Sequence, residues 1–125
     1  MNLITFLHKI QNQQSISFNE TMDIIEVYYD YQPTEFSNGR GDDKLVSSAG
    51  TNQGSCKIFA FGLLQQLTPE QTLHLFGDYY KDVVKNPAGT DHQNIRLFMK
   101  YGWDGVYFQS QALVKKTITL VESSV

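Results

Sequence analysis

Hydrophobic residues recur at helical spacing along most of the chain. The first stripe lies near the N-terminus and consists of Leu3, Phe6, Leu7 and Ile10. Its i, i+3, i+4, i+7 spacing places all four side chains on one face of a helix. The second stripe follows a polar connector and consists of Phe18, Met22, Ile25 and Tyr29. Ser17 and Glu20 have capping-box spacing before it, and Pro33 disfavours helical geometry at residue 32, so we expect this helix to end near residue 29.

Residues 32–54 interrupt the helical pattern. They include four glycines and the acidic pair Asp42 and Asp43, and they carry few apolar side chains. This composition predicts a long loop. Because a loop of that length is uncommon in a small domain unless it has a function, the segment is the first place to look for a site.

The next segment, residues 56–67, is apolar on nearly every side. A helix with this pattern is buried by its neighbours, so the sequence predicts a central helix with Ser55 as its N-cap. Thr68 and Gln71 have capping-box spacing around a proline and predict a fourth helix that continues to about residue 84. Thr90 and Gln93 repeat that spacing and predict a fifth helix that ends near residue 102.

The C-terminal part carries two short β-prone segments, residues 106–108 and 117–121. They favour a small hairpin against the helices, and the second segment is equally compatible with a frayed tail. Between the fifth helix and these segments, two flanking glycines allow Trp103 to turn inward against the helices. The predicted fold class is therefore mainly α, a single compact domain of about five helices around a buried central helix, with a short C-terminal β-hairpin as an option.

Composition narrows the class of protein. The chain has 125 residues, of which 41% are hydrophobic and 18% charged, and its formal net charge is −3. This balance lacks the basic field that binding to a phosphate backbone needs, so no nucleic-acid partner is predicted. The chain also lacks an apolar run long enough to span a membrane and a Sec-type signal, so we expect no membrane partner and a cytoplasmic location.

The cysteine and histidine residues limit which disulfide and metal sites the chain could form. Cys56 is the only cysteine, which excludes an internal disulfide and a multi-cysteine zinc site. The three histidines fall on three different predicted helices without a local carboxylate pattern. No metal site and no cofactor are predicted.

Two groups of residues are candidates for a functional site. Cys56 lies at the predicted start of the central helix, where the helix dipole lowers a thiol pKa, and His92 with Asp91 would complete a nucleophile, base and acid arrangement. The alternative is that Cys56 is a small buried hydrophobic residue and that Asp91 only stabilises a helix start. The second group would bind a ligand at the glycine-rich approach to the central helix and comprises Asn38, Asn52, Gly54, Ser55, Lys57 and Arg96.

Four ordered motifs carry a resemblance to a known family. They begin at Tyr31, Ala49, Thr72 and Gly89, and read YQPTEFSNG, AGTNQGSCKIFAF, TLHLFGDYYKDV and GTDHQNIR, the last continuing to GWDGV. Together they resemble the HopJ type III effector family over about residues 3–113. The resemblance implies a HopJ-like helical domain over residues 1–113, followed by residues 114–125 as an extension or edge strand. Departures from the family pattern include Gln53, where an acidic residue is expected, and Lys81, where arginine is usual.

Three functions remain open at this point. The first is a small helical binding or interaction protein without enzymatic activity, which would recognise a protein or a small molecule. The second is a hydrolase or transferase that uses Cys56 with His92, and the third is a protein that binds a small anion or metabolite. The family name implies delivery into a host cell by type III secretion, and the resemblance implies no established biochemical activity.

Overall fold

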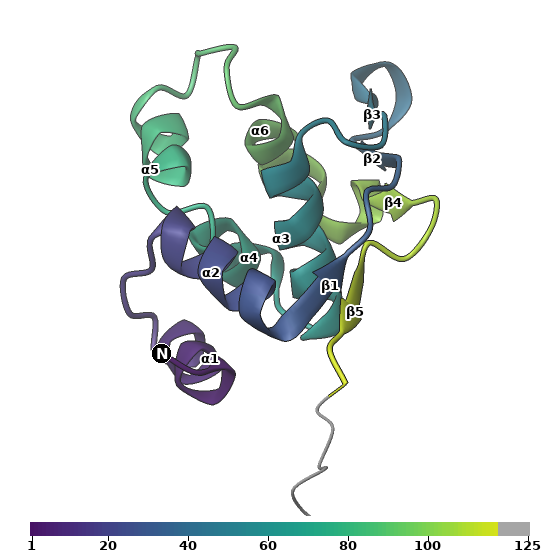
Figure 1. Ribbon diagram of the computed structural model, residues 1–125. Coiled ribbons are helices and arrows are strands. Elements are labelled where there is room, and N and C mark those ends of the chain that lie inside the picture. The colour runs from purple at the N-terminus through teal and green to yellow at the C-terminus, as the bar shows by residue number, and fades with distance from the viewer. Residues whose placement is uncertain (118–125) are drawn as a thin grey trace, which may run out of the picture.

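The computed structural model describes residues 1–117 and consists mainly of helices (Figure 1). The α-helices are α1 (Leu3–Gln11), α2 (Phe18–Tyr28), α3 (Gln53–Leu64), α4 (Pro69–His74), α5 (Asp78–Lys85) and α6 (Gln93–Tyr101). Two short 3₁₀ helices are η1 (Gly41–Asp43) and η2 (Gly102–Gly105). The strands are β1 (Tyr29–Tyr31), β2 (Phe36–Asn38), β3 (Leu45–Ser47), β4 (Tyr107–Phe108) and β5 (Leu113–Lys115). None of the described helices is both long and apolar enough to cross a membrane.

Helix α3 is the centre of the fold, as the sequence predicted. In Figure 1 it lies between the helices α1, α2, α4 and α5 on one side and the strands on the other. Phe59 is fully buried, and its ring contacts the rings of four other residues: Phe36, Phe76, Phe98 and Trp103. The core is therefore built around an aromatic cluster on this helix.

The strands form two small sheets, so the prediction of a mainly helical fold is confirmed only in part. Strand β1 pairs antiparallel with β5, with Tyr29 opposite Lys115. Strand β2 pairs antiparallel with both β3 and β4, which gives the order β3-β2-β4. Each sheet joins segments that are far apart in the sequence.

Residues 32–54 are more ordered than the predicted long loop. They contain β2, η1 and β3, and Phe36 and Asn38 in β2 are buried. Of the expected C-terminal hairpin, residues 107–108 do form a strand, but β4 pairs with β2. The other expected strand, residues 117–121, lies outside the described residues from position 118 onward.

The predicted fourth helix is two helices, because the chain turns at Gly77. This residue has φ 59°, a left-handed value that disfavours other residues. A Cβ atom at Gly77 would also lie 2.6 Å from the backbone nitrogen of Phe18. The close approach to the start of α2 therefore ends α4 and redirects the chain into α5, which gives six described α-helices where five were predicted.

The predicted helix starts fall into two groups. The capping boxes at Ser17–Glu20 and Thr68–Gln71 are both present. In each, the first side chain accepts from the backbone N–H of the fourth residue, and the fourth side chain accepts from the backbone N–H of the first. The box predicted at Thr90–Gln93 is absent, because α6 begins after a left-handed His92. Ser55 is likewise not the N-cap of α3, which begins after a left-handed Asn52.

Trp103 seals one side of the aromatic cluster. Its ring lies edge-on to Phe98 with centroids 4.8 Å apart, and its Nε1–H donates to the carbonyl of Leu67 at 2.9 Å. A Cβ atom at Gly62 of α3 would lie 2.8 Å from the indole, so the ring and the helix are in close contact. The indole therefore links η2 to α3 and to the start of α4.

We expect Trp103→Ala to lower the free energy of unfolding by about 3 to 5 kcal/mol, the range for a large aromatic residue removed from a core. Urea denaturation followed by circular dichroism measures the loss. Tyr107→Ala is the matched control, because that side chain is 71% exposed and its removal should change stability little. Equal effects of the two substitutions would contradict a core role for Trp103.

Candidate functional site

A cleft of about 610 Å³ lies where the N-terminal ends of α3 and α6 meet the first turns of α2 and α5. Its polar wall comes from the two helix starts and includes Asn52, Ser55, Gln93 and Asn94. Its apolar wall includes Phe18, Leu45, Phe76, Tyr79 and Ile95. The cleft is therefore lined by both polar and apolar side chains, and both kinds occur in the first turn of α6.

Three rings make a continuous aromatic face in this cleft. Phe18 and Tyr79 pack edge to face with centroids 5.1 Å apart. The imidazole of His92 lies 5.4 Å from the Tyr79 ring. Such a face offers a flat apolar group both ring contacts and edge contacts.

Helices α3 and α6, which both start at the cleft, lack side-chain caps, as does α5 after Gly77. Asn52 precedes α3 with φ 49° and His92 precedes α6 with φ 51°, and neither side chain caps its helix among the described residues. By contrast, Asn2, Ser17 and Thr68 cap the starts of α1, α2 and α4. Because the first N–H groups of a helix have no acceptor inside the helix, the ends of α3 and α6 present donors and partial positive charge to the cleft.

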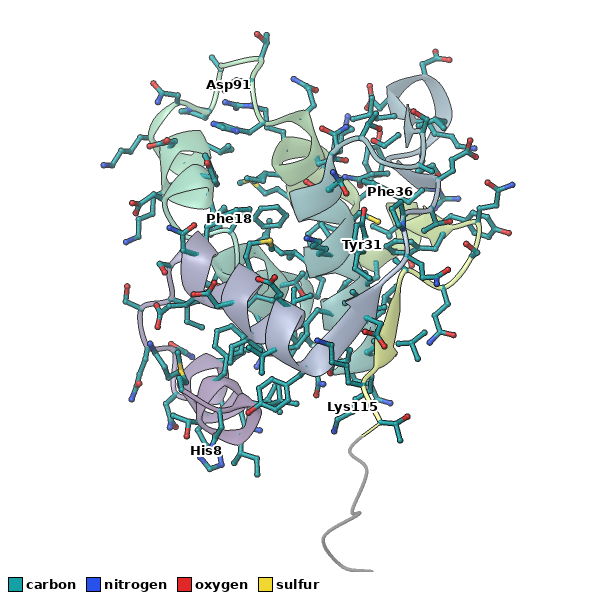
Figure 2. The ribbon with its side chains drawn as sticks, viewed as in Figure 1. His8, Phe18, Tyr31, Phe36, Asp91 and Lys115 are labelled. Atoms are coloured by element: carbon teal, nitrogen blue, oxygen red, sulfur yellow. The ribbon has the colours of Figure 1, made fainter. Side chains whose placement is uncertain are left out.

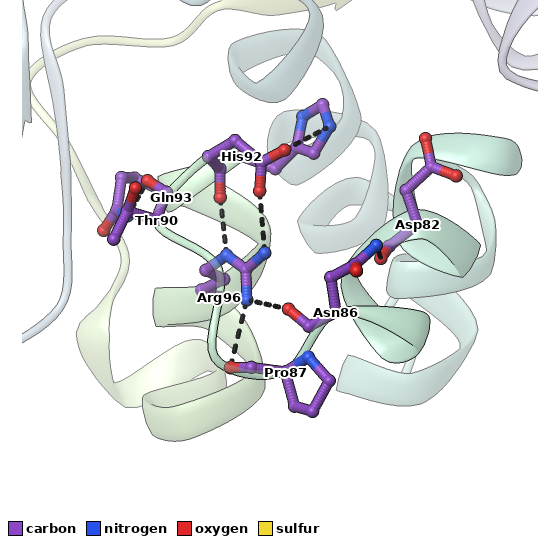
Figure 3. Close-up of polar contacts among 8 residues, drawn as sticks. Asp82, Asn86, Pro87, Thr90, His92, Gln93 and Arg96 are labelled. Carbon is purple, nitrogen blue, oxygen red and sulfur yellow. Dashed lines mark hydrogen bonds and ion pairs between the residues drawn. The ribbon is translucent and has the colours of Figure 1, made fainter.

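Arg96 holds the connection between α5 and α6 that forms the rim of the cleft (Figure 3). Its side chain is 14% exposed and pairs with the Asp91 carboxylate at 2.7 Å. The hydrogen bond from Arg96 lowers the pKa of Asp91 below its ordinary value. Asp91 is therefore ionised at neutral pH, and its charge is balanced by the guanidinium.

His92 and Asp91 do not form a complete catalytic set. The imidazole Nε2 lies 3.7 Å from the Asp91 carboxylate, which is longer than a hydrogen bond. None of the hydrogen bonds described for residues 1–117 joins a serine, threonine or cysteine side chain to His92. Within the same residues, no three histidine, cysteine, aspartate or glutamate side chains gather as a metal site requires.

Cys56 lies away from this cleft, within the core. The predicted position at the first turn is wrong, because α3 begins at Gln53 and the N–H of Cys56 already donates to the carbonyl of Asn52 at 3.0 Å. Its side chain is 1% exposed, and burial raises the pKa of the thiol despite contacts with Tyr31 and the Thr34 backbone. An activated cysteine has the opposite features, namely exposure and a lowered pKa.

Tyr31 covers the thiol. In Figure 2 it lies on the opposite side of α3 from Phe18, which lines the cleft. Its hydroxyl is buried and bonds no nitrogen or oxygen atom among the described residues, and burial raises its pKa to about 12. Lys57 lies 4.7 Å from the centroid of the same ring. Cys56 and Lys57 thus share their surroundings with Tyr31, and neither lines the cleft.

Asn38 supports the cleft from beneath. It is fully buried in β2, and its side-chain amide donates to the carbonyl and to the side-chain oxygen of Asn94, at 2.8 and 3.0 Å. Asn94 in turn lines the cleft. Asn38 therefore orients the start of α6 and is too buried to contact a ligand.

The predicted site residues thus divide into three groups. The cleft brings together Asn52, Gly54, Ser55, Asp91 and His92; Asn38 and Arg96 support it; and Cys56 and Lys57 lie elsewhere. Sequence reasoning missed Phe18 and Tyr79 as cleft residues. Both fall in segments with a helical apolar stripe, and that pattern does not distinguish a cleft wall from a core.

The fold and the cleft define a small, mainly helical protein with a cleft lined by polar and aromatic side chains. The family model described as HopJ type III effector protein matches residues 3–113, so the chain belongs to this family and the resemblance in its motifs is confirmed. No curated protein matches the chain. A crystal structure of the unknown function protein VPA0580 is similar, with 46% sequence identity, a TM-score of 0.87, and coverage of 93% of this chain and 95% of that one.

We expect the Cys56 thiol to react with iodoacetamide at pH 7 at least about tenfold more slowly in the folded protein than in urea, because it is buried and protonated. Cys56→Ala should lower the free energy of unfolding by on the order of 1 kcal/mol, and Cys56→Ser by more, since a buried hydroxyl needs a hydrogen-bond partner. Alkylation kinetics and urea denaturation test both statements. Rapid alkylation of the folded protein near pH 6 that is slowed by His92→Ala would contradict them.

Proposed function

We propose that this protein is a binding protein without enzymatic activity and that its recognition site is the cleft between α3, α5 and α6. The observation that supports it is the presence in one cleft of an aromatic face, formed by Phe18, Tyr79 and His92, and of the uncapped starts of α3 and α6, the second of which follows His92 itself. A cleft of about 610 Å³ has the size of a small-molecule site.

The chemistry of the walls favours a small organic acid as ligand. A flat apolar ring would lie against Tyr79, and a carboxylate would accept hydrogen bonds from the first-turn N–H groups near Ser55 and Asn94. Asp91 is the acidic side chain at the rim, and its pairing with Arg96 reduces its repulsion of an anion. The proposal thus joins the binding-protein hypothesis to the anion-binding one.

The cysteine-dependent hydrolase or transferase is the weaker alternative. It requires a reactive Cys56 within reach of His92, whereas the thiol is buried beside Tyr31 and His92 faces Tyr79. A binding role needs neither residue to be reactive.

The family description adds a proposal about location. Because the family is described as type III effectors, we propose that the protein is made in the bacterial cytoplasm and delivered into a host cell. A translocation reporter fused to the C-terminus of the full chain tests this, with a secretion-deficient strain as control. Equal reporter signal in the two strains would contradict delivery, and it would leave the binding proposal unaffected.

Benzoate and benzamide are matched probes for the cleft, because they have the same ring and shape and differ in charge. We expect benzoate to give saturable chemical-shift changes at the backbone amides of Gly54, Ser55, Gln93 and Asn94, and benzamide to bind at least about tenfold more weakly. Two-dimensional ¹H–¹⁵N NMR measures both titrations. Absence of saturable shifts with benzoate would contradict the proposal, and equal binding of the two probes would contradict its anionic part.

Substitutions in the cleft test separately how the aromatic contact and the anion contact contribute to the affinity for benzoate. Ser55→Asp places a carboxylate in the first turn of α3, where it favours the helix, yet it should weaken benzoate binding about tenfold or more by repulsion. Ser55→Asn is the neutral control of similar size. Tyr79→Ala should weaken both probes, whereas Tyr107→Ala, another exposed tyrosine outside the cleft, should change neither. Unchanged benzoate affinity in Ser55→Asp would exclude the α3 start as the anion contact.

A further inference from the structure

The guanidinium of Arg96 lies inside the connection between α5 and α6 and is bound from several sides (Figure 3). Its Nε–H donates to the backbone carbonyl of Asp91 at 2.6 Å, and its Nη2 to the carboxylate of the same residue at 2.7 Å. Its Nη1 donates to the carbonyls of Asn86 and Pro87 at 2.9 and 3.3 Å. One side chain thus joins the C-terminal end of α5 to the residue before His92.

The surrounding chain is shaped to this side chain. A Cβ atom at Gly89 would lie 2.6 Å from the Arg96 Nη2, so the backbone there passes directly against the guanidinium. Asp91 is 68% exposed, whereas the Arg96 side chain is 14% exposed, so the connection wraps the arginine and leaves the aspartate at the surface. Three of the four acceptors are backbone carbonyls, which cannot rotate away from the donor as a side chain does.

The same connection carries the rim of the cleft. Thr90, Asp91 and His92 all line it, and His92 has the left-handed backbone from which α6 begins. A left-handed conformation is unfavourable for a residue with a side chain, so it persists only where neighbouring contacts hold it. From the next turn of α6, the Arg96 side chain binds the backbone carbonyl of Asp91, the residue immediately before His92.

We propose that Arg96 is the positioning residue of the cleft: its guanidinium fixes residues 86–92 so that His92 and the start of α6 are in place before a ligand arrives. A site that is ordered in advance avoids the cost of ordering on binding. The effect of this residue on ligand affinity rests on the proposed function, whereas its effect on the connection does not.

Arg96→Lys tests the proposal, because it keeps the positive charge and removes the planar fork. We expect amide hydrogen exchange at Gly89, whose N–H donates to the carbonyl of Asn86 at 3.0 Å, to rise about tenfold or more without ligand, while exchange in α1 and α2 stays unchanged. Benzoate affinity should fall several-fold. Lys100→Ala is the control on the same helix, since Lys100 pairs with Asp43 away from the cleft, and it should change neither readout.

Asp91→Asn separates the two kinds of contact. Because it removes the charge of one acceptor and leaves the three carbonyl acceptors, it should raise exchange at Gly89 less than Arg96→Lys does.

The outcomes distinguish this inference from the proposed function. Wild-type exchange at Gly89 in Arg96→Lys would overturn it, as would a uniform rise through all helices, which would indicate a purely global role. Failure of benzoate to bind the wild-type protein would overturn the proposed function, while the exchange result would still decide whether Arg96 holds the connection.

Discussion

The burial of Phe59 at the middle of α3 is the constraint on which the rest of the structure depends. Its ring contacts Phe36 from β2, Phe76 from the turn after α4, Phe98 from α6 and Trp103 from η2. Each aromatic pair contributes roughly 0.5 to 1.5 kcal/mol beyond the area it buries. Because these four partners come from four different segments, one side chain sets how those segments are arranged around the helix.

The cleft follows from this arrangement. With α3 fixed at Phe59, its first turn lies beside the first turn of α6, which is fixed to the same ring through Phe98. The asparagine pair of Asn38 and Asn94 adds a buried polar contact that orients the start of α6. The position of the two helix starts is therefore a consequence of core packing several residues away.

Local signals in the sequence predicted the parts of the fold that depend on neighbours in the chain. The boxes at Ser17 and Thr68 formed because each involves residues three positions apart. Thr90 and Gln93 have the same spacing but do not form a capping box. The Gln93 side chain donates to the Thr90 carbonyl, and α6 begins only at Gln93, after His92. Arg96 binds the backbone there, and the spacing of a capping box carries no information about it. Asn52, Ser55 and His92 were found as candidates because they lie near helix starts, which a sequence reveals.

The rest depended on contacts between distant segments. The residues around Gly77 do not show that the start of α2 passes against this glycine. That contact between distant segments divides the predicted fourth helix into α4 and α5. Strands of two or three residues are too short to show an alternating pattern in the sequence. The pairing of these strands into sheets therefore could not be predicted and was found in the structure. Tyr79 belongs to the cleft because Phe18 packs on it, and Cys56 is buried because Tyr31 covers it.

The two sheets also set an order for folding. Strands β1 and β2 lie in the first third of the chain, yet their partners β5 and β4 are among the last described residues. Closing such long loops costs chain entropy, and contacts distant in sequence form slowly. During synthesis, β1 must therefore wait for β5 with its backbone groups open to solvent. All the residues that line the cleft, from Phe18 to Ile95, leave the ribosome before either late strand. The two sheets accordingly close last, after the segments that line the cleft have emerged.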